Sequence, residues 1–193
     1  MNMKYLRVGI AFEGGNDGEL IATIVRNVLD PYGYTFEYFS PETPGTAILD
    51  YIPSYTRRFV DSSVDMGIFC TDQDDSTVSR RNYIRDKVKL TDAAFLQKAI
   101  IGVPNPHIEA WLLIQDSVVK NILGIDGSLP LPHHELSPKD RLTALYSESE
   151  YIKSRNDLRI EIAQGLDIDI CCRKSSDFNA FVQDIRHVVS SLK

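Results

Sequence analysis

The sequence has little of what marks membrane, secreted or cofactor-binding proteins. No stretch approaches the ~20 uninterrupted apolar residues that a membrane-spanning helix needs, and the first residues lack the small-residue cleavage site of a signal peptide. Neither the Walker pattern nor the dinucleotide-binding fingerprint is complete, and no serine or cysteine nucleophile motif stands out. We therefore expect a cytoplasmic protein that does not contact a membrane.

Cysteine and net positive charge are also scarce. The three cysteines, Cys70, Cys171 and Cys172, have a spacing that suits neither a zinc site nor a disulfide framework, so we expect buried or half-buried thiols. The formal net charge is −6, whereas a protein that binds nucleic acid by charge alone is normally basic. The acidity counts against a stand-alone, tight nucleic-acid binder. It does not exclude an enzyme whose acidic cluster is neutralised by metal ions.

The 193 residues favour one domain, in which strand-like and helix-like segments alternate over the first two-thirds. Strands are expected over residues 4–12, 34–39, 64–70 and 98–103, and helices from Asn16 to a stop at Pro31 and over residues 46–60, 78–90 and 108–123. This order predicts an α/β fold with an open, mainly parallel sheet and helices on both faces. Asn16 and Glu19 have the spacing of a capping box. From Ser137 onward the sequence predicts helices separated by polar breaks.

Four acidic side chains follow two of the expected strands. Glu13 comes directly after the first strand and Asp17 opens the next helix, while Asp72 and Asp74 come directly after the third strand. Ligand sites of parallel α/β sheets lie at the carboxyl ends of the strands, so these carboxylates converge if the two strands are neighbours. Clustered carboxylates repel unless a cation joins them, and oxygen-rich clusters suit Mg²⁺ or Mn²⁺. The sequence therefore predicts a divalent-metal site.

Most of these acids also have a purely structural interpretation. An acid such as Asp17 favours the helix dipole in a first turn, and the acidic run from Asp72 to Asp75 is typical of a solvated turn. Glu13 is harder to explain in this way, because a glutamate before Gly14 and Gly15 adds nothing to a tight turn that Asn or Asp would not supply better. The conjunction of acids at corresponding strand ends favours the metal site.

The same residues resemble the TOPRIM pattern of topoisomerases, primases and overcoming-lysogenization-defect (OLD) nucleases. That pattern is strand-Glu-Gly-x-x-Asp-helix followed by strand-Asp-x-Asp, and here it reads Phe12-Glu13-Gly14-Gly15-Asn16-Asp17 and Thr71-Asp72-Gln73-Asp74. The closer resemblance is to a bacterial TOPRIM-like family of unknown function, related to RloB-type and OLD-type nuclease domains. Members of that family are often encoded beside an ATPase.

Three further segments carry the closer resemblance: Pro104-Asn105 with Ile108-Glu109-Ala110-Trp111-Leu112-Leu113, then Pro138-Lys139-Asp140-Arg141, and finally Phe178-Asn179. The resemblance spans nearly the whole chain. It implies a TOPRIM-like α/β core over residues 1–125 and a helical C-terminal extension, residues 126–193, packed on the same domain. Gly15 departs from the pattern, because many relatives carry a polar or charged residue there.

The resemblance implies phosphodiester chemistry at a Mg²⁺ or Mn²⁺ site. The implied metal ligands are Asp17, Asp72 and Asp74. Glu13 would ligate through one oxygen or act as general acid or base, as the first glutamate does in TOPRIM enzymes. Glu109 is the candidate for a second metal site, with a helix-start acid as the alternative interpretation.

Basic residues could stabilise the transition state or bind a phosphate backbone. Lys139 is the candidate to neutralise transition-state charge, as a lysine does in OLD-type nucleases, and Arg141 could share the task. In a basic run over residues 80–89, Arg81 and Arg85 share one helix face and could hold DNA or RNA beside the metal site. An ordinary solvated surface is the alternative for each.

Together these features predict a Mg²⁺-dependent nuclease or related phosphodiester-cleaving enzyme, acting on DNA or RNA in genome defence or nucleic-acid processing. One alternative is a phosphohydrolase that acts on a small phosphorylated molecule with the same carboxylates. Another is a non-catalytic adaptor subunit of an ATPase complex, against which the retention of four carboxylates argues. The chain has no ATPase segment, so an ATPase would be a partner protein.

Overall fold

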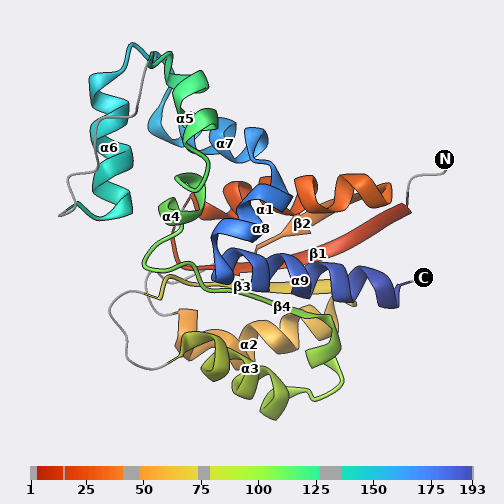
Figure 1. Cartoon of the computed structure of the whole chain (residues 1–193). Helices are drawn as coiled ribbons and strands as arrows, with labels where there is room; N and C mark the ends of the chain where they lie inside the picture. Colours follow the sequence, from red (N-terminus) through yellow and green to blue (C-terminus); the bar gives the residue numbers. More distant parts are fainter. Residues whose placement is uncertain (1–3, 15, 41–47, 74–78, 127–135, 193) are drawn as a thin grey trace.

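The chain forms a parallel β-sheet with helices packed on both of its faces (Figure 1). The computed structural model describes residues 4–14, 16–40, 48–73, 79–126 and 136–192. Its strands are β1 (Lys4–Phe12), β2 (Tyr34–Phe39), β3 (Met66–Cys70) and β4 (Ala99–Gly102). They form one sheet in the order β2-β1-β3-β4, and all three neighbouring pairs are parallel. The predicted α/β class and parallel sheet are confirmed.

The burial of each strand follows from its place in the sheet. All five residues of the central strand β3 are buried, whereas the edge strand β2 alternates buried and exposed residues over its first half. Continuous apolar strands are typical of parallel sheets, because the crossover helices cover both faces. The short run Met66–Cys70 therefore has no solvent-facing side.

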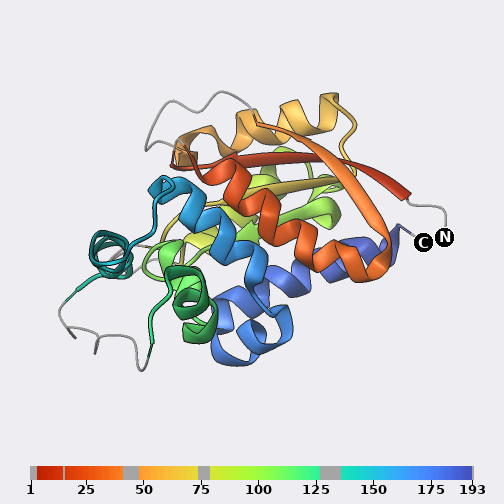
Figure 2. The same ribbon diagram turned by 90° about the horizontal axis from the view of Figure 1, so that it is seen from above.

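The helices first alternate with the strands and then follow them. They are α1 (Asp17–Leu29), α2 (Ile48–Asp61), α3 (Arg80–Thr91), α4 (Glu109–Leu112), α5 (Asp116–Leu123), α6 (Pro138–Glu148), α7 (Arg155–Gly165), α8 (Ile168–Lys174) and α9 (Ser176–Ser191), with 3₁₀ turns at Asp30–Tyr32 and Phe95–Lys98. Helices α2 and α3 cover one face of the sheet and α1 covers the other (Figure 1). Seen from above, α7 lies beside α1 (Figure 2). Among the described residues, no helix is long and apolar enough to cross a membrane.

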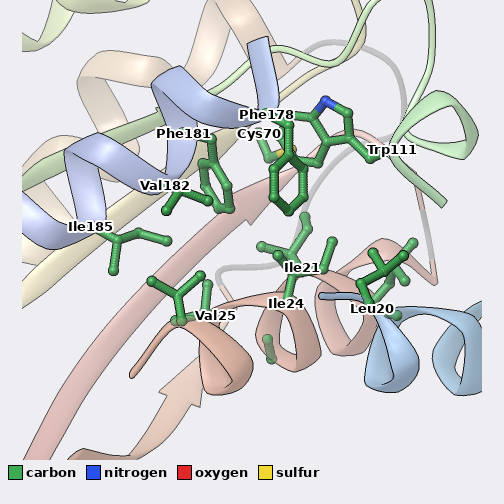
Figure 3. Close-up of a cluster of buried hydrophobic side chains, with 14 of the residues drawn as sticks. Leu20, Ile21, Ile24, Val25, Cys70, Trp111, Phe178, Phe181, Val182 and Ile185 are labelled. Atoms are coloured by element: carbon green, nitrogen blue, oxygen red, sulfur yellow. The ribbon is translucent and has the colours of Figure 1, made fainter. Parts of the chain in front are cut away.

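Each face of the sheet has its own apolar cluster. The cluster beneath α2 and α3 centres on Phe59 and Phe69, whose rings lie 5.4 Å apart. The larger cluster, on the other face, joins side chains of α1 to side chains of α9 (Figure 3). There Trp111 of α4 stacks on Phe181 of α9 with ring centroids 5.1 Å apart. The C-terminal helix therefore shares a core with the first strand and the first helix.

Two local predictions were wrong. The helix expected over residues 108–123 is divided into α4 and α5, because Gln115 leaves the helical conformation with φ −117° and ψ 86°. Its Oε1 accepts a 3.0 Å hydrogen bond from Asp167 N, and Lys174 Nζ donates to the neighbouring Ile114 carbonyl at 3.3 Å. Residues at the two ends of α8 thus contact the chain where the helix is interrupted.

The expected capping box at the start of α1 is the second error. Asn16 makes no side-chain cap hydrogen bond within the described residues. Glu19 binds instead to Arg26 Nη1 at 2.6 Å and accepts a 2.9 Å hydrogen bond from the Tyr38 hydroxyl.

The prediction for the cysteines is confirmed: all three are free thiols, two of them buried and Cys172 half-buried.

Candidate functional site

The carboxyl ends of β1 and β3 place Glu13 beside the segment that follows β3. The two strands are neighbours, and their register pairs Phe12 with Cys70. The next residue of each strand, Glu13 and Thr71, therefore lie side by side, and Thr71 Oγ1 donates a 2.5 Å hydrogen bond to Glu13 Oε2. The condition for convergence of the predicted acids, that their strands be adjacent, is met.

Asp17 lies directly against Gly14 of the segment that follows β1. Asp17 N donates a 3.1 Å hydrogen bond to the Gly14 carbonyl. A side chain at Gly14 would collide with the Asp17 carboxylate, so this glycine permits the close approach. Asp17 is also the first residue of α1, where the helix dipole favours an acid.

Backbone hydrogen bonds beyond β3 and β4 place Asp72 next to Glu109. Gln73 N donates to the Pro104 carbonyl at 2.9 Å, which continues the pairing of β3 and β4 into the segments that follow them. Asp72 Oδ1 accepts a 3.0 Å hydrogen bond from Ile108 N. Glu109 follows as the first residue of α4 and is only 8% exposed. The two acids thus come from adjacent, backbone-linked segments.

Burial perturbs the acidity of two groups at this edge of the sheet, Asp72 and Cys70. Burial raises the pKa of Asp72 from 3.8 to about 7, opposed by the charge of His107 and reinforced by the charges of Asp17 and Glu109. The pKa of the Cys70 thiol also lies well above its usual range, because the thiol is buried and faces the charges of three acids. The carboxylates therefore lie close enough to one another and to the thiol to influence ionisation at this edge.

Two arginines contact the acids, and neither role was predicted from the sequence. Arg159 of α7 is 9% exposed, and its Nη2 lies 2.6 Å from Asp17 Oδ1 and 3.4 Å from Glu109 Oε1. Arg80, the first residue of α3, places its Nη1 3.5 Å from Glu13 Oε2. The sequence shows Arg80 only as a member of a basic run. It gives no motif at Arg159, which lies on an otherwise ordinary amphipathic helix.

The donor set fits a hard divalent cation in its chemistry. The side chains that converge are carboxylates, the groups that Mg²⁺ and Mn²⁺ prefer, and burial together with the charges of Asp17 and Glu109 raises the pKa of Asp72. Within the described ranges, no three His, Cys, Asp or Glu side chains are arranged as a ready ligand group. Asp74, the fourth predicted ligand, lies outside the described residues.

Other predicted basic residues do not join the acids. Lys139 is exposed in the first turn of α6, and no ion pair connects it to an acid within the described part of the chain. Arg81 Nη2 lies 2.7 Å from both carboxylate oxygens of Asp184, and its Nη1 donates to the Ile101 carbonyl. The Arg81 guanidinium therefore links α3 to α9 and β4, while Arg85 is exposed. A phosphate-binding face on α3 stays a prediction, carried mainly by Arg85.

A cavity of about 670 Å³ lies elsewhere in the structure. Residues at the end of α1, the start of β2, and in α8 and α9 line it, among them Arg26, Tyr34, Asp169 and Arg186. It is at the amino end of β2, whereas the acids lie at the carboxyl ends of β1 and β3. This cavity is therefore separate from the acidic cluster.

The resemblance was compared with known proteins in three ways. Comparisons of the chain with protein-family models, with curated proteins and with solved structures found no match. The TOPRIM resemblance of the sequence therefore stays a prediction, and only the site itself bears on function.

Proposed function

We propose that the chain is a Mg²⁺- or Mn²⁺-dependent nuclease, or a related phosphodiester-cleaving enzyme, of the TOPRIM type. The observation that carries the proposal is the gathering of Glu13, Asp17, Asp72 and Glu109 at the carboxyl edge of a parallel sheet, where burial and neighbouring acids raise the pKa of Asp72 to about 7. A strongly perturbed acid in such a position is typical of functional sites. The order of the acids along adjacent strands supports the TOPRIM assignment.

The acids divide into two groups by their contacts. Asp72, with Asp74 outside the described residues, would hold the divalent ion, and Asp17 and Glu109 face the same region. When bound, the ion supplies positive charge against the phosphate oxygens of the substrate. Burial around Asp72 keeps the local dielectric low, which strengthens that charge interaction.

Glu13 is placed to move a proton. Its Oε2 accepts a hydrogen bond from Thr71 Oγ1 and faces Arg80 Nη1, so two groups fix the direction of the carboxylate. A carboxylate held in this way can take the proton of an attacking hydroxyl or return one to a leaving oxygen. We propose Glu13 as the general acid or base, and Arg80 as the residue that orients it.

A phosphohydrolase that acts on a small phosphorylated molecule is the second candidate. The net charge is −6, and the Arg81 guanidinium is engaged by Asp184 rather than offered to a ligand. Both facts reduce the basic surface available to a long phosphate backbone. In the nuclease proposal, an ATPase partner protein supplies the missing binding surface for DNA or RNA.

The test is hydrolysis by the purified protein of labelled single- and double-stranded DNA and RNA, and of small phosphate mono- and diesters, with Mg²⁺, Mn²⁺ or EDTA. We expect cleavage of a nucleic acid with one of the metals, and none in EDTA. Asp72→Asn should remove the activity, whereas the matched control Asp169→Asn, an exposed acid paired with Arg186, should not. Cleavage of small esters alone would favour the second candidate. No cleavage of any substrate by a folded protein would contradict both.

A further inference from the structure

We infer that Arg159 takes the place of a second metal ion, so that the proposed active site binds one divalent cation per chain. The inference rests on the proposed metal-dependent function. It adds the number of ions and names the residue that sets it. Two-metal sites hold their ions about 3.5–4 Å apart between shared carboxylates, and a guanidinium occupies one such position between carboxylates here.

One nitrogen of Arg159 contacts both acids of the candidate second metal position. Its Nη2 lies 2.6 Å from Asp17 Oδ1 and 3.4 Å from Glu109 Oε1, and Glu109 is the residue that the sequence nominates for a second metal. A guanidinium stays protonated throughout the physiological pH range. Arg159 is therefore a permanent cation at the point where Asp17 and Glu109 meet.

The place of Arg159 is fixed by the core around it. Its helix neighbours Leu158 and Ile162 are fully buried, in the cluster that packs α7 against α1. Arg159 itself is 9% exposed, and its buried Nε has no hydrogen-bond partner among the described residues. Burying a charge with an unsatisfied N–H is unfavourable unless other contacts compensate. The two carboxylates supply that compensation, so the guanidinium belongs to the acidic cluster.

The remaining negative charge lies at Asp72. Arg80 accompanies Glu13, and Arg159 accompanies Asp17 and Glu109, but no ion pair joins Asp72 to a Lys or Arg in the part of the chain that the structure describes. A divalent cation would therefore bind beside Asp72, while the position between Asp17 and Glu109 already holds the Arg159 guanidinium. A second divalent ion there would also be repelled by the guanidinium.

The decisive measurement is the number of Mn²⁺ ions bound per chain of the parent protein, followed by electron paramagnetic resonance during a titration. We expect one ion with the spectrum of an isolated Mn²⁺. Two spin-coupled ions would overturn the inference and leave the proposed metal-dependent function standing. No bound Mn²⁺ would overturn the inference and the metal-dependent function together, so the two failures are distinguishable.

Variants of Arg159 test the residue itself. Arg159→Met keeps the length and removes the charge, and we expect it to bind a second Mn²⁺ per chain; Arg159→Lys should still bind one. Arg186→Met is the matched control, because Arg186 lies outside the acidic cluster and pairs with Asp169 at a distance of 2.9 Å. The number of Mn²⁺ ions that this variant binds should equal that of the parent. An Arg159→Met protein that binds one ion with the parent's affinity would make Arg159 a structural bridge only. If this variant does not fold, the counts of the parent and of Arg159→Lys decide.

Discussion

Arg159 Nη2 lies 2.6 Å from Asp17 Oδ1, although 142 residues separate the two along the chain. The contact joins α7 to the first turn of α1, where the acids follow β1. Further along the same pair of helices, Asn27 Nδ2 donates a 2.8 Å hydrogen bond to the Ala163 carbonyl. The C-terminal helices therefore contribute a charged group to the candidate site as well as apolar surface to the core.

Asp72→Asn should stabilise the metal-free protein at neutral pH. Burial and the charges of Asp17 and Glu109 raise the pKa of Asp72 from 3.8 to about 7 in the folded chain. A carboxyl whose pKa is raised by folding costs stability progressively as the pH rises from about 4 to about 7, because the folded state opposes its ionisation. Asparagine can still accept the hydrogen bond from Ile108 N and carries no charge.

The measurement is the thermal midpoint in EDTA across this pH range, for the parent, Asp72→Asn and the control Asp169→Asn. The advantage of Asp72→Asn over the parent should be small near pH 4 and largest at about pH 7 and above. Asp169 is 70% exposed and paired with Arg186, so its variant should show no such growth. An advantage independent of pH would mean that Asp72 ionises like an ordinary surface acid.

Mg²⁺ or Mn²⁺ should raise the thermal midpoint of the parent. An ion that binds only the folded state stabilises it by about 2.7 kcal/mol at a concentration 100 times its Kd, or roughly 5–10 °C for a chain of this size. Replacing both Asp72 and Asp74 with asparagine should remove the rise. Differential scanning fluorimetry with and without EDTA measures it. A double variant that responds to the ions as the parent does would place the site elsewhere.

Glu13→Gln should separate catalysis from metal binding. The amide oxygen can still accept the hydrogen bond from Thr71 Oγ1, so the local structure should survive, but the proton-transfer group is gone. We expect hydrolysis to fall by about 10²-fold or more, the usual scale for a positioned acid or base. The metal-dependent rise in thermal midpoint should remain.

The control for that substitution is Glu148→Gln at an exposed position of α6, which should change neither rate nor midpoint. Initial rates on whichever phosphodiester the parent cleaves provide the comparison. Full activity in Glu13→Gln would show that the proton is moved by another group.

Arg81→Ala and Arg85→Ala should behave differently, although both lie on α3. Arg81 binds Asp184 and the Ile101 carbonyl, so its loss should destabilise the fold by about 1.5–3 kcal/mol, the range for hydrogen bonds to charged groups. Arg85 is exposed, and its loss should leave the thermal midpoint unchanged. If Arg85 contacts a phosphate of duplex DNA, the slope of log affinity against log salt should fall by about 0.9. Equal slopes for Arg85→Ala and the parent would show that Arg85 is an ordinary solvent-exposed residue that contacts no phosphate.

The strands and most helices could be predicted because local patterns determine them. Continuous apolar runs such as Met66–Cys70 are bounded by polar turns, and Pro31 with Gly33 ends the first helix region. The break at Gln115 could not be predicted, since the helix pattern continues through it. It depends on partners such as Asp167, which the sequence places 52 residues away.

The candidate site also combines residues whose positions the sequence predicts with residues whose positions it does not. The positions of Glu13 and Asp72 follow from the rule that ligands bind at the carboxyl ends of parallel strands, which needs only the strand boundaries. The positions of Arg80 and Arg159 need the packing of α3 and α7, which no spacing in the sequence specifies. Burial of an arginine between acids is a property of the assembled core, and only the structure shows it.

The most direct measurement of the central claim is anomalous diffraction from crystals of the parent protein soaked in Mn²⁺. The proposed function requires an anomalous peak at the carboxyl edge of β1 and β3, in contact with the Asp72 carboxylate and close to Glu13, with Arg159 still between Asp17 and Glu109. Such a peak should be lost in crystals of Asp72→Asn. Well-diffracting crystals in which Mn²⁺ binds only at other carboxylates, or in which this edge stays without a peak at saturating Mn²⁺, would contradict the account.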